Sequence, residues 1–276
     1  MSVLNNKVKT HQVRLLKTRL SKLILLMLVG LINATCIKTE NEINIEKKYQ
    51  GLIEHNIEWI DIVNRKGSLT KFYHSSASLL FGNEWYLTID AIEDKLHELN
   101  IKNRTALCIH EHDSTKLFEI GEYVLSNDKV LVYIAGYSYQ NGFWLRRIEI
   151  LYEKTKNFVD DQVIERIVFS RDKKWKKLLL IKDAEKLIDE LFWREARYFN
   201  LTKEYHTNTY EELIHEYRWI ELPNIQFSVK TLDYRIVNNN VIYIIGQYQA
   251  RMKGLYTLIL TKNDENVWKN ILDANY

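Results

Sequence analysis

The sequence predicts an α+β protein made of two domains, and two observations indicate this. Stretches with apolar residues at helical spacing are followed by Tyr-, Val- and Ile-rich stretches of strand character, and this order occurs twice. A strand is also repeated: "KVLVYIAGYSY" resembles "NVIYIIGQYQA" when Gly136 is aligned with Gly246, which places Tyr133 on Tyr243. The copies lie about 110 residues apart, which is roughly one domain length.

The first domain is expected over residues 45–181. Apolar residues recur at helical spacing from Ile45 to Val63, and Thr88 is a suitable N-cap for a second helix over 89–99. After Asn100 the pattern becomes extended, with short connections that favour antiparallel neighbours. The predicted strands cover 116–126, 129–139, 143–154, 163–170 and, as the closing strand, 171–181.

The second domain is expected over residues 183–276, where the same order restarts. Residues 183–199 have the spacing of a helix, and Asn208 or Thr209 can cap another helix over 210–220. The closing strand of the first domain, "DKKWKKLL", is matched with "DENVWKNIL" of the second. The strands expected after Pro223 cover 225–237, 240–250, 255–262 and 267–273.

The N-terminal residues 1–35 have the character of a signal segment. Six of the 39 Lys and Arg residues lie there with no acidic residue, so the remaining 33 face all 36 Asp and Glu residues. The basic stretch is followed by a short apolar run from Leu23 to Ile32, which is too short for a permanent membrane span. The acidic body argues against nucleic-acid binding, and the N-terminus is the one part expected to meet a membrane.

Two alternatives exist for processing of this segment. "INATC" resembles a bacterial lipoprotein signal, in which Cys36 is lipidated and residues 36–44 form a tether; Asn33 and Thr35 depart from the usual pattern. The rival is ordinary cleavage after Ala34. Both place the protein in the cell envelope or outside the cell. An uncleaved anchor or an organellar presequence is the remaining alternative for this segment. Cys108 is then an unpaired strand residue, with a disulfide to Cys36 as the alternative.

The order of elements resembles the nuclear-transport-factor-two-like superfamily, which includes the SnoaL-like cyclases. The resemblance is carried by "WIDIVNRKGSLTKFYHSSASLLFGNEWYLTIDAIEDKL" at the opening of the first unit and by "LYTLILTKNDENVWKNILD" at the end of the second. It implies two cone-shaped domains, each with N-terminal helices packed on a curved antiparallel sheet. It also implies that the domains pack sheet to sheet as an internal pseudo-dimer. Gly136 and Gly246 are then expected at bends of the sheets.

The expected function is non-catalytic binding of a small apolar or aromatic ligand, or of a partner protein. The alternatives are a cyclase, isomerase or dehydratase acting on a small hydrophobic substrate, and an interaction or immunity-type lipoprotein. Asp233 is taken as the one Asp within an apolar strand, and a solvent-facing position is expected for it. No catalytic residue, cofactor or metal is assigned. The candidate ligand-binding residues are Tyr73, Trp85, Tyr133, Tyr137, Trp144, Arg146, Trp219 and Tyr243.

Three polar motifs each allow a structural role beside a functional one. "HEHD" could place His110 and His112 on one side of a strand as metal ligands, or form a solvated loop. His74 and His206 occur at similar stages of the two units and could act as bases or fill turn positions. The Arg146–Arg147 pair could direct one guanidinium into a cone or form a charged outer pair balanced by Glu149 and Glu153.

Overall fold

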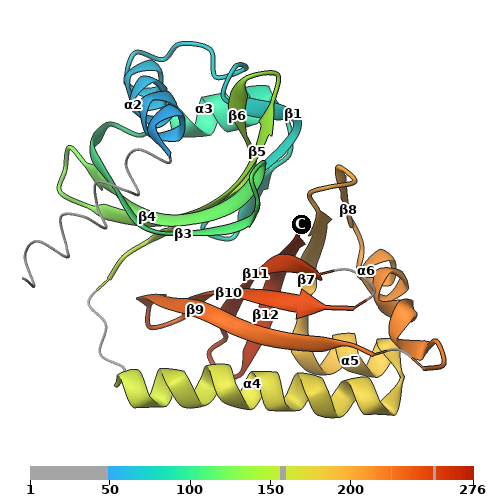
Figure 1. Cartoon of the computed structure of the whole chain (residues 1–276). Coiled ribbons are helices and arrows are strands. Elements are labelled where there is room, and N and C mark those ends of the chain that lie inside the picture. The colour runs from blue at the N-terminus through green and yellow to red at the C-terminus, as the bar shows by residue number, and fades with distance from the viewer. Residues whose placement is uncertain (1–48, 156–159, 225, 251–252) are drawn as a thin grey trace, which may run out of the picture. The chain divides into compact units, whose positions relative to one another are not determined.

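The computed structural model describes residues 49–155, 160–224, 226–250 and 253–276. The predicted signal segment, the tether with Cys36, and the start of the first predicted helix lie outside these residues. Both sheets of the protein belong to one compact unit, His55–Tyr276 (Figure 1). Within the described ranges, no helix has both the length and the apolar character needed to cross a membrane.

The first sheet has six strands in the order β2-β1-β6-β5-β4-β3, and its neighbours run antiparallel except β1 and β6. From His55 onward, α2 lies over the curved face of this sheet (Figure 1): Asn56 bonds to Arg146 on β6 and Asn64 to the backbone of Ile101 on β3. The elements are α2 (Gln50–Asn64), β1 (Tyr73–Phe81), β2 (Glu84–Tyr86), α3 (Ile89–Leu96), β3 (Ile101–Asp113), β4 (Lys116–Leu125), β5 (Val130–Gln140) and β6 (Phe143–Glu153).

The second sheet repeats this arrangement in the order β8-β7-β12-β11-β10-β9, again with one parallel pair, β7 and β12. The α+β class and the presence of two helix-covered curved sheets are therefore confirmed. The elements are α4 (Asp161–Ile181), α5 (Ala184–Leu191), β7 (Phe192–Asn200), β8 (Tyr205–His206), α6 (Tyr210–Tyr217), η1 (Arg218–Glu221), β9 (Ser228–Asn238), β10 (Val241–Gln249), β11 (Lys253–Lys262) and β12 (Trp268–Asn275).

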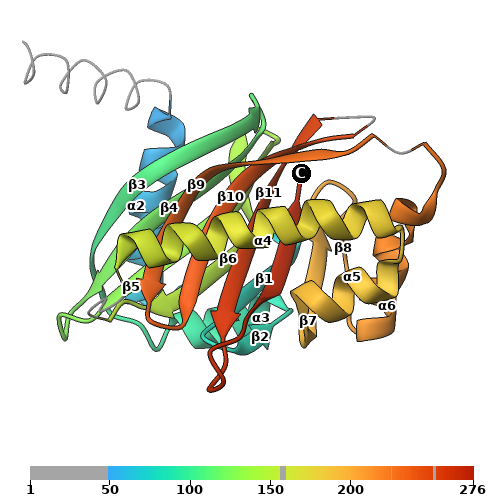
Figure 2. The same ribbon diagram turned by 90° about the horizontal axis from the view of Figure 1, so that it is seen from below.

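The strands predicted over 163–170 and 171–181 are wrong, because these residues form the single long helix α4. Asp160 caps it by accepting a hydrogen bond from the Gln162 amide. Its buried residues recur every three or four positions, and Figure 2 shows α4 crossing the face of the second sheet. Ile164 and Val168 pack there with Ile244 and Leu258. The domain boundary near 181–183 stays a prediction; these contacts favour a boundary between β6 and α4.

The helix predicted over 183–199 is half right. Asp183 caps α5 through the Lys186 amide, but the helix ends at Leu191. Phe192 is already extended, and the following residues pair in parallel with β12 as strand β7. Pairing with a neighbouring strand therefore overrides the helical spacing of this segment. The predicted caps Thr88 and Thr209 are confirmed, since each accepts a hydrogen bond from the amide three residues on.

The strand alignment inferred from the repeat is displaced by one strand. By sheet order, β10 corresponds to β4 and β11 to β5, so Tyr133 corresponds to Tyr256 and not to Tyr243. The match of "DKKWKKLL" with "DENVWKNIL" fails as well, since the first segment lies in α4 and the second leads into β12. Gly136 and Gly246 do lie beside register shifts, as expected for bends.

A cross-strand pair of Gly and Tyr identifies the correct alignment. Gly121 on β4 lies opposite Tyr133 on β5, and Gly246 on β10 lies opposite Tyr256 on β11. In both sheets the tyrosine ring occupies the space that a β-carbon on the glycine would need. The ring covers the bare backbone of the glycine, a device that fixes strand register. The two sheets thus repeat in side-chain detail as well as in strand order.

One apolar core contains buried residues of both sheets. Ile134 and Ile150 of the first sheet belong to it together with Ile245 and Ile259 of the second. Tyr243 lies in this core, and its hydroxyl donates a 3.0 Å hydrogen bond to the carbonyl of Val132. A buried hydroxyl needs such a partner, and here the backbone of the first sheet supplies it.

Candidate functional site

Each sheet carries one buried carboxylate at an equivalent position on its last strand. Glu149 on β6 lies opposite Ala135, two residues after Tyr133. Asp273 on β12 lies opposite Leu258, two residues after Tyr256. Because Tyr133 and Tyr256 correspond, Glu149 and Asp273 correspond as well. We call the side-chain space around Glu149 the first cone and that around Asp273 the second cone.

The first cone is filled, and its carboxylate is fully engaged. Glu149 accepts hydrogen bonds from the hydroxyl of Tyr73 and, at 2.7 Å, from the hydroxyl of Tyr123. Arg146 Nε lies 3.7 Å from Glu149 Oε2, and both side chains are completely buried. This carboxylate is balanced by one cation and two hydroxyl donors, so no group of a ligand is needed to satisfy it.

Aromatic rings complete the packing of the first cone. The guanidinium carbon of Arg146 lies 4.1 Å from the ring centre of Trp59, and its Nη2 donates a 2.6 Å hydrogen bond to Asn56 Oδ1. Tyr137 donates to the same oxygen at 3.2 Å. Burial and the charge of Glu149 raise the pKa of the Tyr73 hydroxyl, which keeps it a hydrogen-bond donor. Interlocked side chains therefore occupy this interior.

The second cone contains a cavity of about 170 Å³. Its walls combine an aromatic group with a few polar side chains. Trp219 and Phe227 lie 4.8 Å apart between ring centres, and Trp175 meets Tyr217 edge to face at 5.7 Å. The lining residues on which the argument depends are Arg171, Trp175, Tyr217, Trp219, Phe227 and Asp273. An apolar cavity with a small number of placed polar groups is typical of a small-molecule site.

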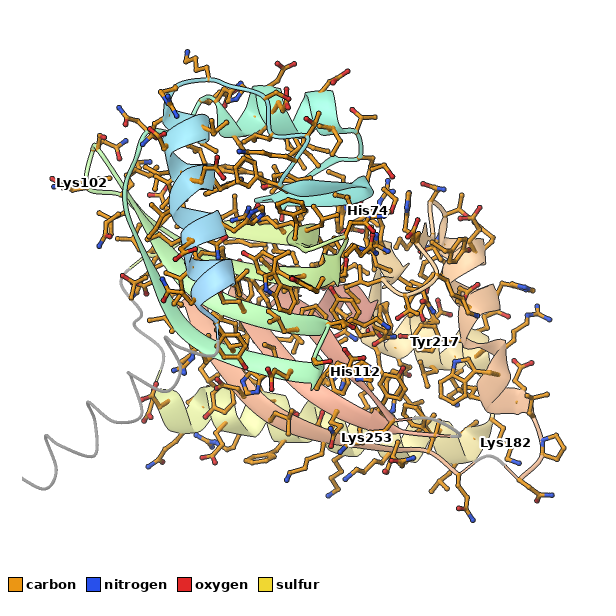
Figure 3. All side chains as sticks on the ribbon, turned by 45° about the horizontal axis from the view of Figure 1, so that its top comes forward. His74, Lys102, His112, Lys182, Tyr217 and Lys253 are labelled. Atoms are coloured by element: carbon orange, nitrogen blue, oxygen red, sulfur yellow. The ribbon has the colours of Figure 1, made fainter. Side chains whose placement is uncertain are left out.

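Asp273 is the polar centre of this cavity. Its Oδ2 accepts a hydrogen bond from the hydroxyl of Tyr217, which comes from the last turn of α6 (Figure 3). Its Oδ1 is buried and has no hydrogen-bond partner among the residues that the structure describes. Burial raises the pKa of the Asp273 carboxyl to about 6, although Tyr217 and Arg171 act in the opposite direction. The Oδ1 atom is therefore an acceptor that a bound molecule can satisfy.

Arg171 supplies the nearest positive charge but is partly neutralised. Its Nη1 lies 3.2 Å from Asp172 Oδ1, and its guanidinium carbon lies 5.0 Å from the ring centre of Trp175. Asn270 corresponds to Arg146 of the first cone. Arg146 on β6 pairs with β5 just past a register shift, and Asn270 on β12 pairs with β11 just past the equivalent shift. A neutral amide thus replaces the guanidinium that fills the first cone.

The predicted ligand-binding residues are dispersed over the molecule. Trp219 lines the second cavity, whereas Tyr243 lies in the core shared by the sheets. Trp85 stacks on Phe199 at 5.1 Å, and Trp144 packs against Tyr139 at 5.2 Å. The other four are buried in the first cone: Tyr73, Tyr133, Tyr137 and Arg146.

The histidine candidates lie away from the cavity lining. His74 Nε2 lies 3.3 Å from Glu204 Oε1, and burial lowers the pKa of this histidine. His206 stacks on Phe199 at 5.2 Å, and burial lowers its pKa too. His112 lies 3.7 Å from Asp113. These contacts give each ring a structural partner.

Both arginines of the Arg146–Arg147 pair are buried, so neither forms a charged outer pair. Arg147 donates 2.9 Å hydrogen bonds to the Leu201 carbonyl and to Glu204. Glu153, the expected partner, pairs with Lys129 at 2.9 Å instead. The prediction that one guanidinium enters a cone therefore holds for Arg146, where it meets Glu149 rather than an open site.

The central residues of the second cavity were missed by sequence reasoning. The sequence pattern indicates Asp233 as the one Asp within an apolar strand, yet Asp273 also lies in such a strand, "NILDANY", flanked by Leu272 and Ala274. An acid within an apolar strand is the signal that could have found it. Trp175 and Arg171 were missed because their helix was predicted as a strand.

Comparison with known proteins supplies structural neighbours only. No protein-family model matches the chain, and no curated protein matches it. Solved structures do. An NTF2-like protein of unknown function from Silicibacter pomeroyi DSS-3 is 9% identical, covering 40% of this chain and 98% of its own, with a TM-score of 0.34. One from Shewanella baltica OS155 is 12% identical, covering 40% and 96%, also with a TM-score of 0.34.

A type 2 hexachlorocyclohexane dehydrochlorinase is 13% identical, covering 41% of this chain and 90% of its own, with a TM-score of 0.32. At such identities and scores these neighbours carry no argument about fold or function, and the fold rests on strand order and register.

Proposed function

We propose that the second cone binds one small, largely aromatic molecule that carries a hydrogen-bond donor, and that this binding is the function of the protein. The observation that carries the proposal is Asp273 Oδ1, a buried acceptor in an aromatic cavity that has no partner in the described part of the chain. A bound donor removes the cost of leaving this oxygen unpaired. Without such a molecule, no hydrogen-bond donor of the described residues reaches this oxygen.

The size of the cavity favours one or two fused rings. A dry cavity of about 150 Å³ holds a benzene-sized molecule, and the second cavity has about 170 Å³. The rings of Trp175, Trp219 and Phe227 offer faces and edges for stacking. Arg171 already offsets part of the negative charge of Asp273, so a neutral ligand with one N–H or O–H group suits the site better than a cation.

Indole and indene test this proposal because they share shape and differ in one N–H group. Titration calorimetry should give tighter binding of indole by about 10–100-fold, the value of a hydrogen bond to a charged acceptor. In Asp273→Ala the two probes should bind equally. Asp264→Asn, which removes an exposed carboxylate, should keep the preference. Equal binding of both probes to the unaltered protein, or a preference that persists in Asp273→Ala, contradicts the proposal.

An enzymatic alternative has one specific observation in its favour. A carboxyl with a pKa of about 6 in an apolar cavity suits a general base, as in a SnoaL-like isomerase. Asp273 would take a proton from the carbon beside a ketone and return it two carbons further on, which moves the double bond into conjugation. The assay is conversion of 3-cyclohexenone to its conjugated isomer, followed by absorbance. Asp273→Asn should abolish any turnover; absence of turnover leaves binding as the function.

We also propose export with a lipid anchor on Cys36. The support is in the sequence: a basic stretch, a short apolar run and "INATC". Mass spectrometry of the protein from its native host should find a lipid on Cys36 as the first residue. Cleavage after Ala34 without lipid indicates plain secretion, and an intact Met1 in a cytosolic fraction contradicts export.

We further propose that the two units act as an internal pseudo-dimer. The support is the apolar core that includes residues of both sheets. An interaction or immunity-type lipoprotein would instead expose an apolar sheet face to its partner. The apolar residues of that core are buried within the chain, which favours the ligand-binding proposal over this alternative.

A further inference from the structure

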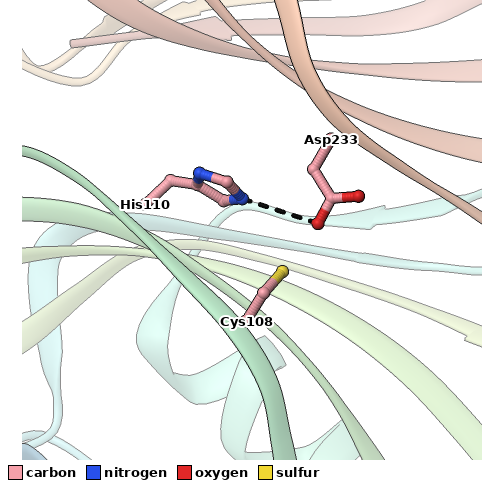
Figure 4. Close-up of side chains that lie close together, drawn as sticks. All are labelled: Cys108, His110 and Asp233. Carbon is pink, nitrogen blue, oxygen red and sulfur yellow. Dashed lines mark ion pairs between the residues drawn. The ribbon is translucent and has the colours of Figure 1, made fainter. Parts of the chain in front are cut away.

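Cys108, His110 and Asp233 form a second cluster of functional side chains, apart from the cavity of the second cone. Cys108 and His110 lie two residues apart on β3, a spacing that places side chains on the same side of a strand. Asp233 comes from β9. Figure 4 shows the three side chains pointing toward one another, and one ligand atom of each lies within 4.8 Å of the other two.

The three groups are the ligand types that zinc takes in proteins. A thiolate, an imidazole nitrogen and a carboxylate oxygen bind Zn²⁺ at about 2.0–2.3 Å, which holds tetrahedral ligand atoms roughly 3.3–3.8 Å apart. His110 Nε2 and Asp233 Oδ2 are already 3.5 Å apart. The remaining separations are at most 4.8 Å, so binding of the ion would shorten each of them by up to roughly 1.5 Å.

The hydrogen bonding of the cluster is incomplete. His110 Nε2 is buried and has no hydrogen-bond partner within the described ranges, since its 3.5 Å separation from Asp233 is long for such a bond. Cys108 forms no disulfide within the described residues, and its thiol hydrogen-bonds with the side chain of Asp233. Asp233 Oδ1 is held by the Tyr234 amide at 2.8 Å, which leaves Oδ2 directed at the imidazole. A backbone donor that fixes a carboxylate ligand is a common support of metal sites.

Arg235 is the one competing cation that the structure places on this carboxylate within the described residues. Its Nη2 lies 3.4 Å from Asp233 Oδ2, and its side chain is 44% exposed. The guanidinium can therefore move into solvent when a metal takes its place. Asp233, Arg235 and Leu107 also line an open cavity of about 640 Å³, which provides an entry path and space for a water ligand.

We propose that Cys108, His110 and Asp233 bind one Zn²⁺ ion, with water as the fourth ligand. The thiol of Cys108 releases its proton to solvent when the bond to zinc forms. Because two ligands come from the first sheet and one from the second, the ion links β3 to β9 by coordinate bonds. The site does not depend on the proposed ligand of the second cone, so either proposal can fail alone.

Cobalt is a suitable probe because a thiolate ligand gives Co²⁺ an intense charge-transfer absorption. The parent is the full chain with Cys36→Ser, which leaves Cys108 as the one thiol. One equivalent of Co²⁺ should produce this absorption, and Zn²⁺ should remove it. Cys108→Ser should abolish it, and His110→Gln and Asp233→Asn should weaken metal binding by at least about tenfold. His112→Gln, on the same strand but outside the cluster, should match the parent.

Thermal unfolding without metal identifies any variant that fails to fold, and the remaining variants then decide the outcome. Zn²⁺ should raise the melting temperature of the parent and of His112→Gln but not of Asp233→Asn. A parent without the thiolate absorption, or an absorption and a zinc-dependent stabilisation that survive both His110→Gln and Asp233→Asn, overturns the proposal.

Discussion

The two cones are built on separate sheets with the same strand order, and they differ in the side chains that occupy their interiors. The first closes around Glu149 with Arg146 and the Trp59 ring, so every oxygen of the carboxylate has a partner. The second keeps Asp273 at the equivalent position but has Asn270 where the first has Arg146. A buried acid is therefore a packing element in one unit and an available acceptor in the other. Its neighbours, rather than its place on the strand, make this difference.

Replacing the guanidinium should have the largest effect. Arg146→Leu leaves Glu149 buried without its cation, and loss of one partner of a buried pair costs about 3–5 kcal/mol. Asn270→Leu at the equivalent position should cost little or even stabilise, because both side-chain polar atoms of Asn270 are buried without partners among the described residues. Urea unfolding measures both variants. Equal losses in the two would show that the cones do not differ in the way described.

The pH dependence of stability should separate the cones next. Burial raises the pKa of Asp273 from 3.8 to about 6, so the folded protein keeps a proton that the unfolded chain has released. The free energy of unfolding therefore falls as pH rises from about 4 through 6, by up to about 2–3 kcal/mol. Asp273→Asn stays neutral and should lack this decrease.

Urea unfolding at pH 4 and pH 8 measures this difference. Asp264→Asn, at an exposed position, should follow the wild-type protein. If Asp273→Asn retains the full pH dependence of the wild type, the carboxyl of Asp273 is ionised in the fold at no cost, and the cavity is wetter than its walls indicate.

The helix caps should give the smallest effects and should be alike in the two units. Thr88 Oγ1 accepts from the Ala91 amide at 3.3 Å, and Thr209 Oγ1 accepts from the Glu212 amide at 3.2 Å. Thr88→Ala and Thr209→Ala should each destabilise by about 1 kcal/mol. Thermal unfolding checks this. A clearly larger loss of stability in one variant would mean that the two caps contribute unequally to the stability of their units.

Local patterns predicted the fold class and the repeat, but not the pairing of its strands. Thr88 and Thr209 were found because a cap depends on residues close in sequence. The helix α4 was missed because Val163, Ile164, Ile167 and Val168 are β-branched and typical of strands. Packing of these residues against the second sheet favours the helix over a strand, and this packing is a tertiary contact that the local sequence does not show.

The strand shift in the repeat has a related cause. "VYIAG" and "YIIG" are alike as letters, whereas the true correspondence depends on which glycine each tyrosine ring covers. That contact joins residues on two neighbouring strands, so the sequence of either strand alone does not reveal it. The candidate site was missed for the same reason, since Asp273, Tyr217 and Trp175 come from β12, α6 and α4 and meet only in the folded chain.

A pair with its glycine on β4 or β10 and its tyrosine on β5 or β11 occurs once in each sheet, and this repetition in a single chain has a genetic consequence. In an assembly of identical subunits, a substitution that blocks one interior blocks every interior. In this chain a codon in one half can change while its counterpart stays as it is. One half can therefore hold buried residues such as Arg146 and Trp59 that fill its interior, while the other half keeps a cavity.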